Sequence, residues 1–404
     1  MSFKQFSTDQ DVINFVQTHT AVFNNSPDLT VTEIGDGNIN FVYRVDDGSN
    51  SLIVKQALPY IRVIGEAWPL SQDRIRIEAK ALKQSEAFSP GSVPEVYHYD
   101  AASCAIIMAD IGHYQNMREA LTERRPLPGV ARELGELLAR NLFYSSDFYL
   151  SSSAKKAMVQ AFINPDLCQI SEEVYFWDPF CDHERNNVNP PLAARAAQWW
   201  QDDELKQAVA RLKMKFQNQA QVLLHGDLHT GSVFVDPSAE NKVKIIDPEF
   251  AFVGPAGFDL GVLLANYLLN LAGQARAGGD PAERHAYQQT LLTDLNILWQ
   301  SLADSFRSLA ADHTQDPCLQ GAAVVDAWLA ELLTDSLGFA GVEMTRRTLG
   351  VAHVADVEQI EDDAARAEAQ AMCLDIADLL IKHAPQFSGM PVITAAVSEL
   401  SFCR

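Results

Sequence analysis

Apolar and polar positions follow a strand-like pattern in the first quarter of the chain. Short apolar and β-branched runs predict strands over residues 29–34, 41–45, 51–56, 93–99 and 104–108. The Asp47-Gly48 pair between the second and third runs is typical of a tight hairpin turn. This part of the pattern therefore predicts an antiparallel sheet.

Two segments of the same region follow a helical period instead. Thr8 and Asp11 form a capping signature ahead of a helix predicted over residues 8–20. A second helix is predicted over residues 71–86, where apolar residues recur every three or four positions.

The pattern becomes mainly helical after residue 112, and strand character returns only between residues 222 and 246. Residues 258–272 form the most apolar helical stretch. This stretch contains polar side chains and is shorter than the ~20 residues that span a bilayer, so it predicts a buried helix. The whole pattern predicts an α+β chain of two lobes, residues 1–110 and 111–404.

Composition narrows the classes of function. The 404 residues are 47% hydrophobic and 21% charged, which is typical of a globular protein. Acidic residues outnumber basic ones by 53 to 31, a net charge of −22, which argues against general nucleic-acid binding. The first residues lack the apolar core of a signal peptide, and the six cysteines form no CxxC, so we expect a cytoplasmic protein without membrane partners.

The strongest chemical signal is the segment LHGDLHTGS at residues 224–232, followed by two short strands and then Asp247-Pro248-Glu249. Asp227 is placed to accept a proton from a hydroxyl group, and Asp247 and Glu249 are placed to hold a hard divalent cation. Two acidic turns at neighbouring strand ends favour phosphoryl transfer over a pair of solvated turns.

The two histidines of this segment have several interpretations. His225 and His229 are conceivable metal ligands beside Asp227, but the further His or Cys ligands of a zinc site are not evident nearby. We expect His225 to bond the loop backbone, and the role of His229 stays open. Asp259 is expected to accept backbone hydrogen bonds from the same loop.

Two weaker signals lie in the predicted sheet. Residues 35–40, GDGNIN, place glycines between two strands, where backbone amides can approach phosphates. The segment lacks GxGxxG and a Walker lysine, which argues against Rossmann and P-loop proteins. Lys55 follows on the next strand, and on the inner face of a sheet it needs an anionic partner, for which Glu78, Glu86 or a nucleotide phosphate are candidates. An exposed lysine at a sheet edge is the alternative.

The order of these motifs resembles the protein-kinase-like fold, and more closely the methylthioribose kinase family, which is related to aminoglycoside and choline kinases. The resemblance rests on five segments: GDGNIN (35–40), VKQALPYIRVIGEAWPL (54–70), HGDLHTGS (225–232), DPEF (247–250) and TRRTLGVAHVADVEQI (345–360). It implies a small antiparallel N-terminal lobe and a large helical C-terminal lobe.

The resemblance implies ATP and Mg²⁺ as cofactors. It implies nucleotide contacts for residues of both lobes: Asn40, Lys55, Ala109, Asp110, Ile111, Asp247, Pro248 and Glu249. Lys55 resembles the lysine on the α- and β-phosphates, and Asp247 and Glu249 resemble the magnesium ligands. Trp68 falls in a segment similar to the family's tryptophan loop near the nucleotide.

On the acceptor side the resemblance implies that Asp227 is the catalytic base and that Arg346 and Arg347 bind the substrate and the transferring phosphoryl group. Without the resemblance, the arginines fit a helix face paired with Glu343 or Asp356. The implied reaction is phosphorylation of the 1-hydroxyl of 5-methylthioribose, a step of methionine salvage, by a homodimer.

Alternatives remain at this point. The same chemistry on an aminoglycoside, choline or another sugar is the nearest, and a nucleotide-binding scaffold without catalysis is another. Ser232 stands where protein kinases have a metal-binding asparagine, and the polar cluster at residues 183–187 has no assigned role.

Overall fold

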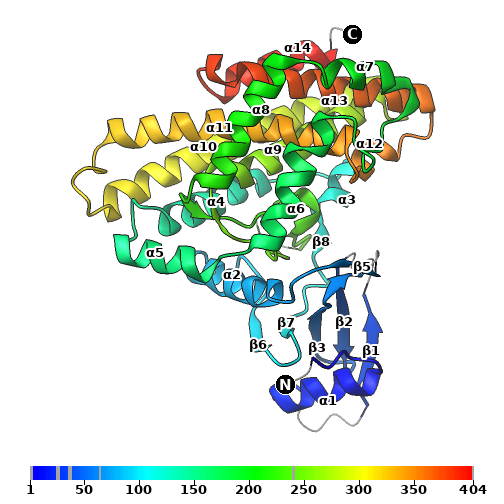
Figure 1. Ribbon diagram of the computed structural model, residues 1–404, viewed down its shortest axis with the longest axis vertical. Helices are drawn as coiled ribbons and strands as arrows, with labels where there is room; N and C mark the ends of the chain where they lie inside the picture. The colour runs from blue at the N-terminus through cyan, green and yellow to red at the C-terminus, as the bar shows by residue number, and fades with distance from the viewer. Residues whose placement is uncertain (1–2, 24–27, 35–38, 63–64, 239–241, 403–404) are drawn as a thin grey trace.

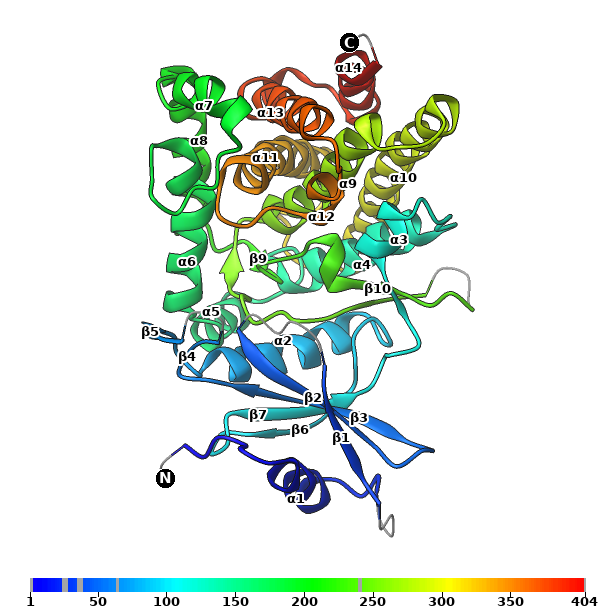
Figure 2. The same ribbon diagram turned by 90° about the vertical axis from the view of Figure 1, so that its right-hand side faces the viewer.

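The computed structural model describes residues 3–23, 28–34, 39–62, 65–238 and 242–402. A β-sheet with two helices lies at one end of the molecule, and a larger group of helices lies at the other (Figure 1). The N-terminus lies at the sheet end and the C-terminus at the far end of the helices (Figure 2). We call these two parts the sheet lobe, from α1 to β7, and the helical lobe, from β8 onward.

The sheet has five antiparallel strands in the order β1-β2-β3-β7-β6. Their bounds are Thr30–Glu33 for β1, Asn40–Asp46 for β2, Ser51–Ala57 for β3, Val96–Asp100 for β6 and Ala105–Ala109 for β7. All five predicted strands are confirmed. Residues 35–38 of the glycine-rich segment lie outside the described residues.

Strand alternation buries both faces of the sheet. Leu52 and Val54 of β3 pack against α1 (Asp9–His19), whereas Ile53 packs against α2 (Arg74–Phe88) on the other face. The predicted capping box of α1 is present. In both ribbon views α2 lies between the sheet and the helical lobe.

The sequence pattern did not predict one small hairpin. Strands β4 (Tyr60–Ile61) and β5 (Gly65–Pro69) pair after β3. They are too short for a periodic pattern to show. Trp68 of β5 packs in an apolar cluster with Ile61 and with Leu167 of the helical lobe, so this hairpin contacts both lobes.

The helical lobe contains most of the chain. Its α-helices are α3 (Met117–Thr122), α4 (Val130–Ser145), α5 (Ser152–Ala161), α6 (Pro165–Phe176), α7 (Ala193–Trp199), α8 (Asp203–Asn218), α9 (Gly257–Arg276), α10 (Pro281–His313), α11 (Ala322–Leu349), α12 (Ala355–Glu358), α13 (Asp363–His383) and α14 (Met390–Phe402). Single 3-10 turns lie at Asp178–Phe180, Pro190–Leu192, Thr230–Ser232 and Ala384–Gln386.

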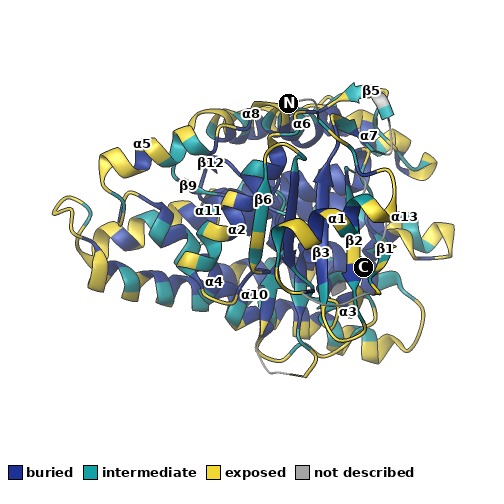
Figure 3. Cartoon of the chain, turned by 90° about the horizontal axis from the view of Figure 1, so that it is seen from below, coloured by how far each residue is buried: buried dark blue, intermediate teal, exposed yellow. Residues whose placement is uncertain are grey.

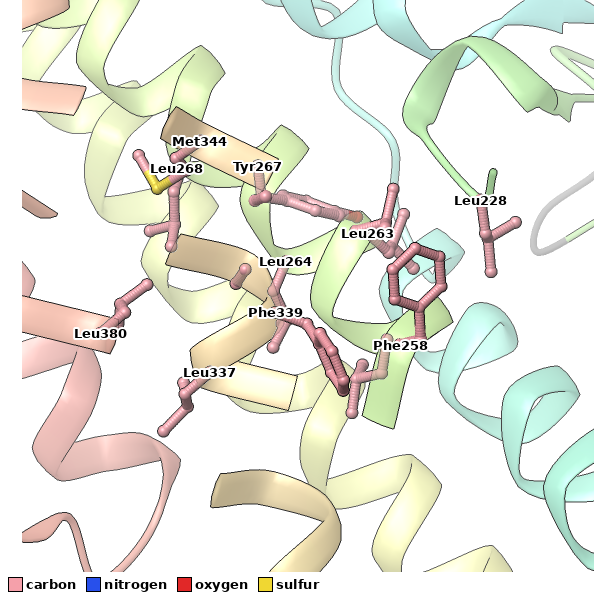
Figure 4. Packing of buried hydrophobic residues seen from close by; sticks show 14 of the residues in the cluster. Leu228, Phe258, Leu263, Leu264, Tyr267, Leu268, Leu337, Phe339, Met344 and Leu380 are labelled. Atoms are coloured by element: carbon pink, nitrogen blue, oxygen red, sulfur yellow. The ribbon is translucent and has the colours of Figure 1, made fainter. Parts of the chain in front are cut away.

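Helix α9 forms the centre of this lobe and is buried from Gly257 to Gln274. Phe258 packs edge-on against Phe339 of α11, with ring centroids 5.4 Å apart (Figure 4). Exposed residues concentrate on the outer faces of the surrounding helices (Figure 3). The buried helix predicted here is confirmed, and no described helix is both long and apolar enough to cross a bilayer.

Short strands position two loops at the boundary between the lobes. They are β8 (Gln115–Asn116), β9 (Val222–Leu223), β10 (Val233–Val235), β11 (Val243–Ile245) and β12 (Val253–Gly254). The loop at residues 224–232 joins β9 to β10, and the loop at residues 246–252 joins β11 to β12. We call them the HGD loop and the acidic loop.

Candidate active site

The HGD loop is held by backbone hydrogen bonds to buried side chains. The amides of His225 and Gly226 donate to the Asp259 carboxylate, at 2.6 and 3.0 Å. His225 Nδ1 accepts from the Asp227 amide at 3.2 Å, so its Nε2 donates to the Ile246 carbonyl at 2.8 Å. The structural roles predicted for His225 and Asp259 are confirmed, and the bond to Ile246 ties the HGD loop to the acidic loop.

The Asp227 carboxylate faces different groups on its two oxygens. The Tyr175 hydroxyl donates to Oδ1 at 3.2 Å, and the Arg346 and Arg347 guanidinium nitrogens lie 3.7 and 3.9 Å from the same oxygen. His229 Nε2 lies 3.5 Å from Oδ2. Burial raises the pKa of Asp227, but His229 and the two arginines outweigh burial and hold the pKa well below its usual range.

Burial shifts the pKa of His229 in the opposite direction. Desolvation lowers its pKa to about 4, although Asp227 opposes this shift, so the ring is neutral near pH 7. His229 Nδ1 lies 3.3 Å from Ser232 Oγ, which also lies 3.3 Å from the Asp227 carbonyl. Ser232 therefore supports the loop backbone.

The two arginines are oriented by one buried carboxylate on their own helix. Glu343 accepts from Arg346 Nη1 at 3.0 Å and from Arg347 Nε at 2.6 Å. The pairing with Glu343 expected from helix spacing is confirmed, and the arginines reach Asp227 as well. Asp356, the other expected partner, instead lies 3.5 Å from Arg118 Nε.

Lys55 is buried against carboxylates from two places in the chain, α2 and the acidic loop. Its ammonium lies 2.8 Å from Glu78 Oε2 and also pairs with Asp247. Glu86 accepts from the Gly91 amide instead, so of the two glutamates it is Glu78 that pairs with Lys55. Burial alone lowers the pKa of Lys55, but Asp247, Glu78 and Glu249 outweigh burial and raise it.

The same carboxylates form a cluster of oxygen donors. Oxygens of Glu78, Asp247 and Glu249 all lie within 4.8 Å of one another. Burial is the main reason that the pKa of Glu78 rises to about 8 and that the pKa of Glu249 rises. Hard divalent cations prefer such donors, so the residues present fit Mg²⁺. Asp247 adopts a left-handed backbone with φ +68°, and its side chain is 45% exposed.

Arg74 is a site residue that the sequence did not single out. Its side chain is buried, and its Nη2 donates to Asn40 Oδ1 at 2.8 Å. Asn40 Nδ2 in turn donates to Glu249 Oε2 at 2.7 Å, and Arg74 Nε lies 3.4 Å from the same oxygen. Protein groups therefore hold both ends of the Asn40 amide and link β2 to the acidic loop.

A cavity of about 220 Å³ lies between the lobes beside this cluster. Lys55 and Asp247 line its polar part. Its other walls are mostly apolar and come from both lobes: Ile34, Val42, Ile53, Leu82, Pro94, Met108, Phe234 and Ile246. The predicted linker residues Ala109, Asp110 and Ile111 also line it. Such walls suit a flat aromatic ring with phosphates directed toward Lys55.

The remaining predicted residues have structural contacts. Arg185 bonds the Asp178 carboxylate at 2.7 Å and pairs with Glu173 at 2.8 Å, so residues 183–187 form a loop tied back to α6. The Arg185 guanidinium also lies 5.7 Å from the centre of the Trp68 ring. Pro248 is buried between the two acidic residues of its loop.

Comparison with known proteins places this arrangement in a family. Residues 30–304 match the model of a phosphotransferase enzyme family. A methylthioribose kinase of Yersinia pseudotuberculosis is 41% identical over 394 residues, which cover 97% of this chain and 96% of that protein. The chain belongs to the methylthioribose kinase family. A second member, from Enterobacter sp. (strain 638), is 40% identical over 98% of both chains.

Membership of the methylthioribose kinase family confirms the enzyme class and the protein-kinase-like fold that the motifs predicted. Among solved structures, a spectinomycin phosphotransferase in complex with ADP and spectinomycin is 16% identical, with a TM-score of 0.47 over 94% of this chain and 100% of that one. A Plasmodium vivax ethanolamine kinase is 12% identical, with a TM-score of 0.47 over 92% of this chain and 89% of that one.

Sequence reasoning missed two residues that contact the candidate site, Tyr175 and Arg74. Each contacts a site residue that is distant in sequence, 52 positions away for Tyr175 and Asp227, and 34 for Arg74 and Asn40. Their local patterns are those of ordinary helix residues, so no signal in the single sequence marks them.

Proposed function

We propose that the protein transfers the γ-phosphoryl group of ATP to the 1-hydroxyl of 5-methylthioribose, giving 5-methylthioribose 1-phosphate and ADP. The observation that supports this most is the Asp227 carboxylate beside Arg346 and Arg347. The HGD loop, which carries Asp227, is hydrogen-bonded to the acidic loop, which carries the Asp247 partner of Lys55. The chain is also similar over nearly its whole length to methylthioribose kinases.

The reaction uses the chain's own groups in defined ways. The 1-hydroxyl oxygen forms a bond to the γ-phosphorus while the bond from that phosphorus to the β–γ bridging oxygen breaks. The hydroxyl proton passes to Asp227, whose low pKa keeps it ionised and able to orient the hydroxyl. Arg346 and Arg347 donate to the acceptor and offset charge on the transferring group.

The nucleotide side is assigned in the same proposal. Lys55, held by Glu78, contacts the α- and β-phosphates, and Ala109 to Ile111 border the adenine. Asp247 and Glu249 would hold Mg²⁺, which when bound offsets charge on the ATP phosphates. We place Asn40 at the nucleotide end through its bond to Glu249, with Pro248 fixing the spacing of the two acids.

The charge beside the base restricts the class of acceptor. Two guanidinium groups beside the base repel cations, which disfavours choline and polyamine-like aminoglycosides as acceptors. A neutral sugar with adjacent hydroxyls suits these donors.

The proposed enzyme has two lobes with different roles. Residues 1–110 form the nucleotide-binding lobe, and residues 111–404 carry the base and the acceptor site. We further propose a cytoplasmic homodimer, an expectation that follows from the family resemblance. Light scattering on the purified protein tests the oligomeric state, and a monomer at micromolar concentration contradicts it.

The function is tested by ADP release from Mg-ATP with 5-methylthioribose, choline and kanamycin as parallel acceptors. We expect turnover with methylthioribose alone, and its loss in Asp227→Ala. Turnover with choline or kanamycin but not methylthioribose overturns the substrate and keeps the chemistry. ATP binding without turnover on any acceptor favours a scaffold instead.

A further inference from the structure

Tyr175 contacts two residues of the site at once. It lies in the last turn of α6 with 2% of its surface exposed, and its hydroxyl donates to Asp227 Oδ1 at 3.2 Å. The Arg346 guanidinium carbon lies 4.1 Å from the centre of its ring. One side chain thus reaches the base by its polar end and a substrate arginine by its aromatic face.

We propose that Tyr175 is a positioning residue that fixes the base carboxylate through its hydroxyl and the acceptor-binding Arg346 through its ring. The inference rests on the roles of Asp227 and Arg346 in the proposed function. It adds a residue from α6, which belongs to none of the motifs that carry the family resemblance.

The hydroxyl orients the base. Tyr175 donates a hydrogen bond to Oδ1 and the Arg346 and Arg347 guanidinium groups lie at ion-pair distance from the same oxygen, whereas Oδ2 faces His229 alone among these four groups. Because these groups engage the lone pairs of Oδ1, this oxygen is a poor acceptor for a further proton. The arrangement therefore directs Oδ2 toward the acceptor hydroxyl. Burial raises the pKa of Tyr175 well above its usual value, so the hydroxyl stays a donor at neutral pH.

The ring orients the arginine. Arg346 is held on one side by Glu343, at 3.0 Å, and on the other by the Tyr175 face. The ring itself packs against Phe258, with centroids 5.2 Å apart, and Phe258 neighbours the Asp259 that anchors the HGD loop. The base, its loop and Arg346 are thereby packed against one rigid aromatic group.

The simpler interpretation is a core tyrosine that only fills space. Its ring packs among phenylalanines, as a core residue would. A space-filling role, however, requires neither the hydroxyl bond to the base nor the cation over the ring. The two interpretations differ in what loss of the hydroxyl alone does to catalysis.

Two substitutions separate the functions of the hydroxyl and the ring. Tyr175→Phe removes only the bond to Asp227, and we expect kcat to fall about tenfold with the acceptor KM unchanged. Tyr175→Leu also removes the ring, and we expect the acceptor KM to rise about tenfold in addition. The KM for Mg-ATP should stay at the wild-type value in both.

A matched control is available in the same lobe. Tyr267 of α9 is also buried, at 1% exposure, and lies in the apolar core shown in Figure 4. Tyr267→Phe should leave kcat and both KM values unchanged. Thermal unfolding of each variant shows whether a kinetic change reflects stability alone, and if Tyr175→Leu does not fold, Tyr175→Phe decides.

The inference is overturned if Tyr175→Phe keeps the wild-type kcat, or if the acceptor and ATP KM values rise equally. Failure of the proposed function gives a different result, because the wild type would then turn over another acceptor. The kcat and KM of the Tyr175 variants relative to the wild type, measured with that acceptor, would still decide the role of Tyr175.

Discussion

At the scale of single residues, the site depends on a few buried charges that share partners. Glu343 has no exposed surface and accepts hydrogen bonds from both Arg346 and Arg347. Two adjacent guanidinium groups repel each other, so one carboxylate between them stabilises the pair and aims both at Asp227. The i, i+3 and i, i+4 spacing made this pairing predictable from sequence, whereas the shared approach to Asp227 was not.

Removal of the Glu343 charge should therefore destabilise the fold and the acceptor site together. In Glu343→Gln we expect a loss of about 3 kcal/mol in the free energy of unfolding, because a buried ion pair loses one partner. The acceptor KM should rise as well. Urea denaturation measures the first effect. The control is Glu331→Gln on the same helix, where the carboxylate is 54% exposed, and equal effects of the two substitutions would refute this role.

A second residue-scale prediction concerns pH. The pKa of His229 is about 4 in the folded protein and about 6.5 in the unfolded chain. The unfolded state carries the extra proton between these values, so stability falls as pH is lowered through that window. The shift corresponds to about 3 kcal/mol between pH 7 and pH 4.

His229→Gln should flatten that dependence. Urea denaturation at several pH values gives the free energy of unfolding for both proteins, and their difference isolates the histidine from other titrating groups. We expect the wild type to lose more stability than the variant below pH 6.5. Parallel curves would show that His229 takes up its proton as readily in the folded protein as in the unfolded chain.

At the scale of elements, the HGD loop depends on a backbone conformation and close packing at Gly226. Its φ is +87°, and a Cβ atom there would lie 2.3 Å from the Phe250 carbonyl oxygen of the acidic loop. The two loops therefore approach each other at a point that admits no side chain. Gly48, in the turn before β3, has φ +85° but open space around it.

These two glycines make a matched pair. Gly48→Ala should lower the free energy of unfolding by about 1 kcal/mol, from backbone strain alone. Gly226→Ala should lower it by about 3 kcal/mol, because the two loops must also separate, and kinase activity should be lost. Denaturation and kinase assays check both, and comparable losses at the two positions would contradict the close approach.

Elements with a clear pattern were predictable and those without one were not. Successive side chains of strand β3 lie on two apolar faces, and α1 carries a complete capping box. Both elements were therefore predicted within a few residues. The β4–β5 hairpin has strands too short for any period. The partners of Tyr175 and Arg74 depend on how distant segments pack, which local patterns do not encode.

At the scale of the whole molecule, polar contacts join the two lobes beside the proposed nucleotide site. Asn40 of β2 donates to Glu249 of the acidic loop, and buried Arg74 bonds Asn40. Lys55 of β3 pairs with Asp247 of the same loop. The groups assigned to the metal and the phosphates are therefore positioned by both lobes, so lobe closure and nucleotide binding are expected to be coupled.

Asn40→Ala tests this coupling. It removes a donor from Glu249 and an acceptor from Arg74, each buried, so we expect the KM for Mg-ATP to rise about tenfold. The acceptor KM should not change. Asn50→Ala, an exposed position in a turn of the same sheet, should leave both unchanged. A larger change in the acceptor KM than in the ATP KM would show that Asn40 acts on the other side of the site.

The measurement that tests the central claim most directly is kcat for methylthioribose phosphorylation by Asp227→Asn beside the wild type. The amide keeps the size of the side chain and removes the proton-accepting charge. We expect kcat to fall about 1,000-fold, with both substrates still bound at near wild-type KM. A variant that keeps most of the wild-type kcat would contradict the assignment of Asp227 as the base, and with it the proposed chemistry of the site.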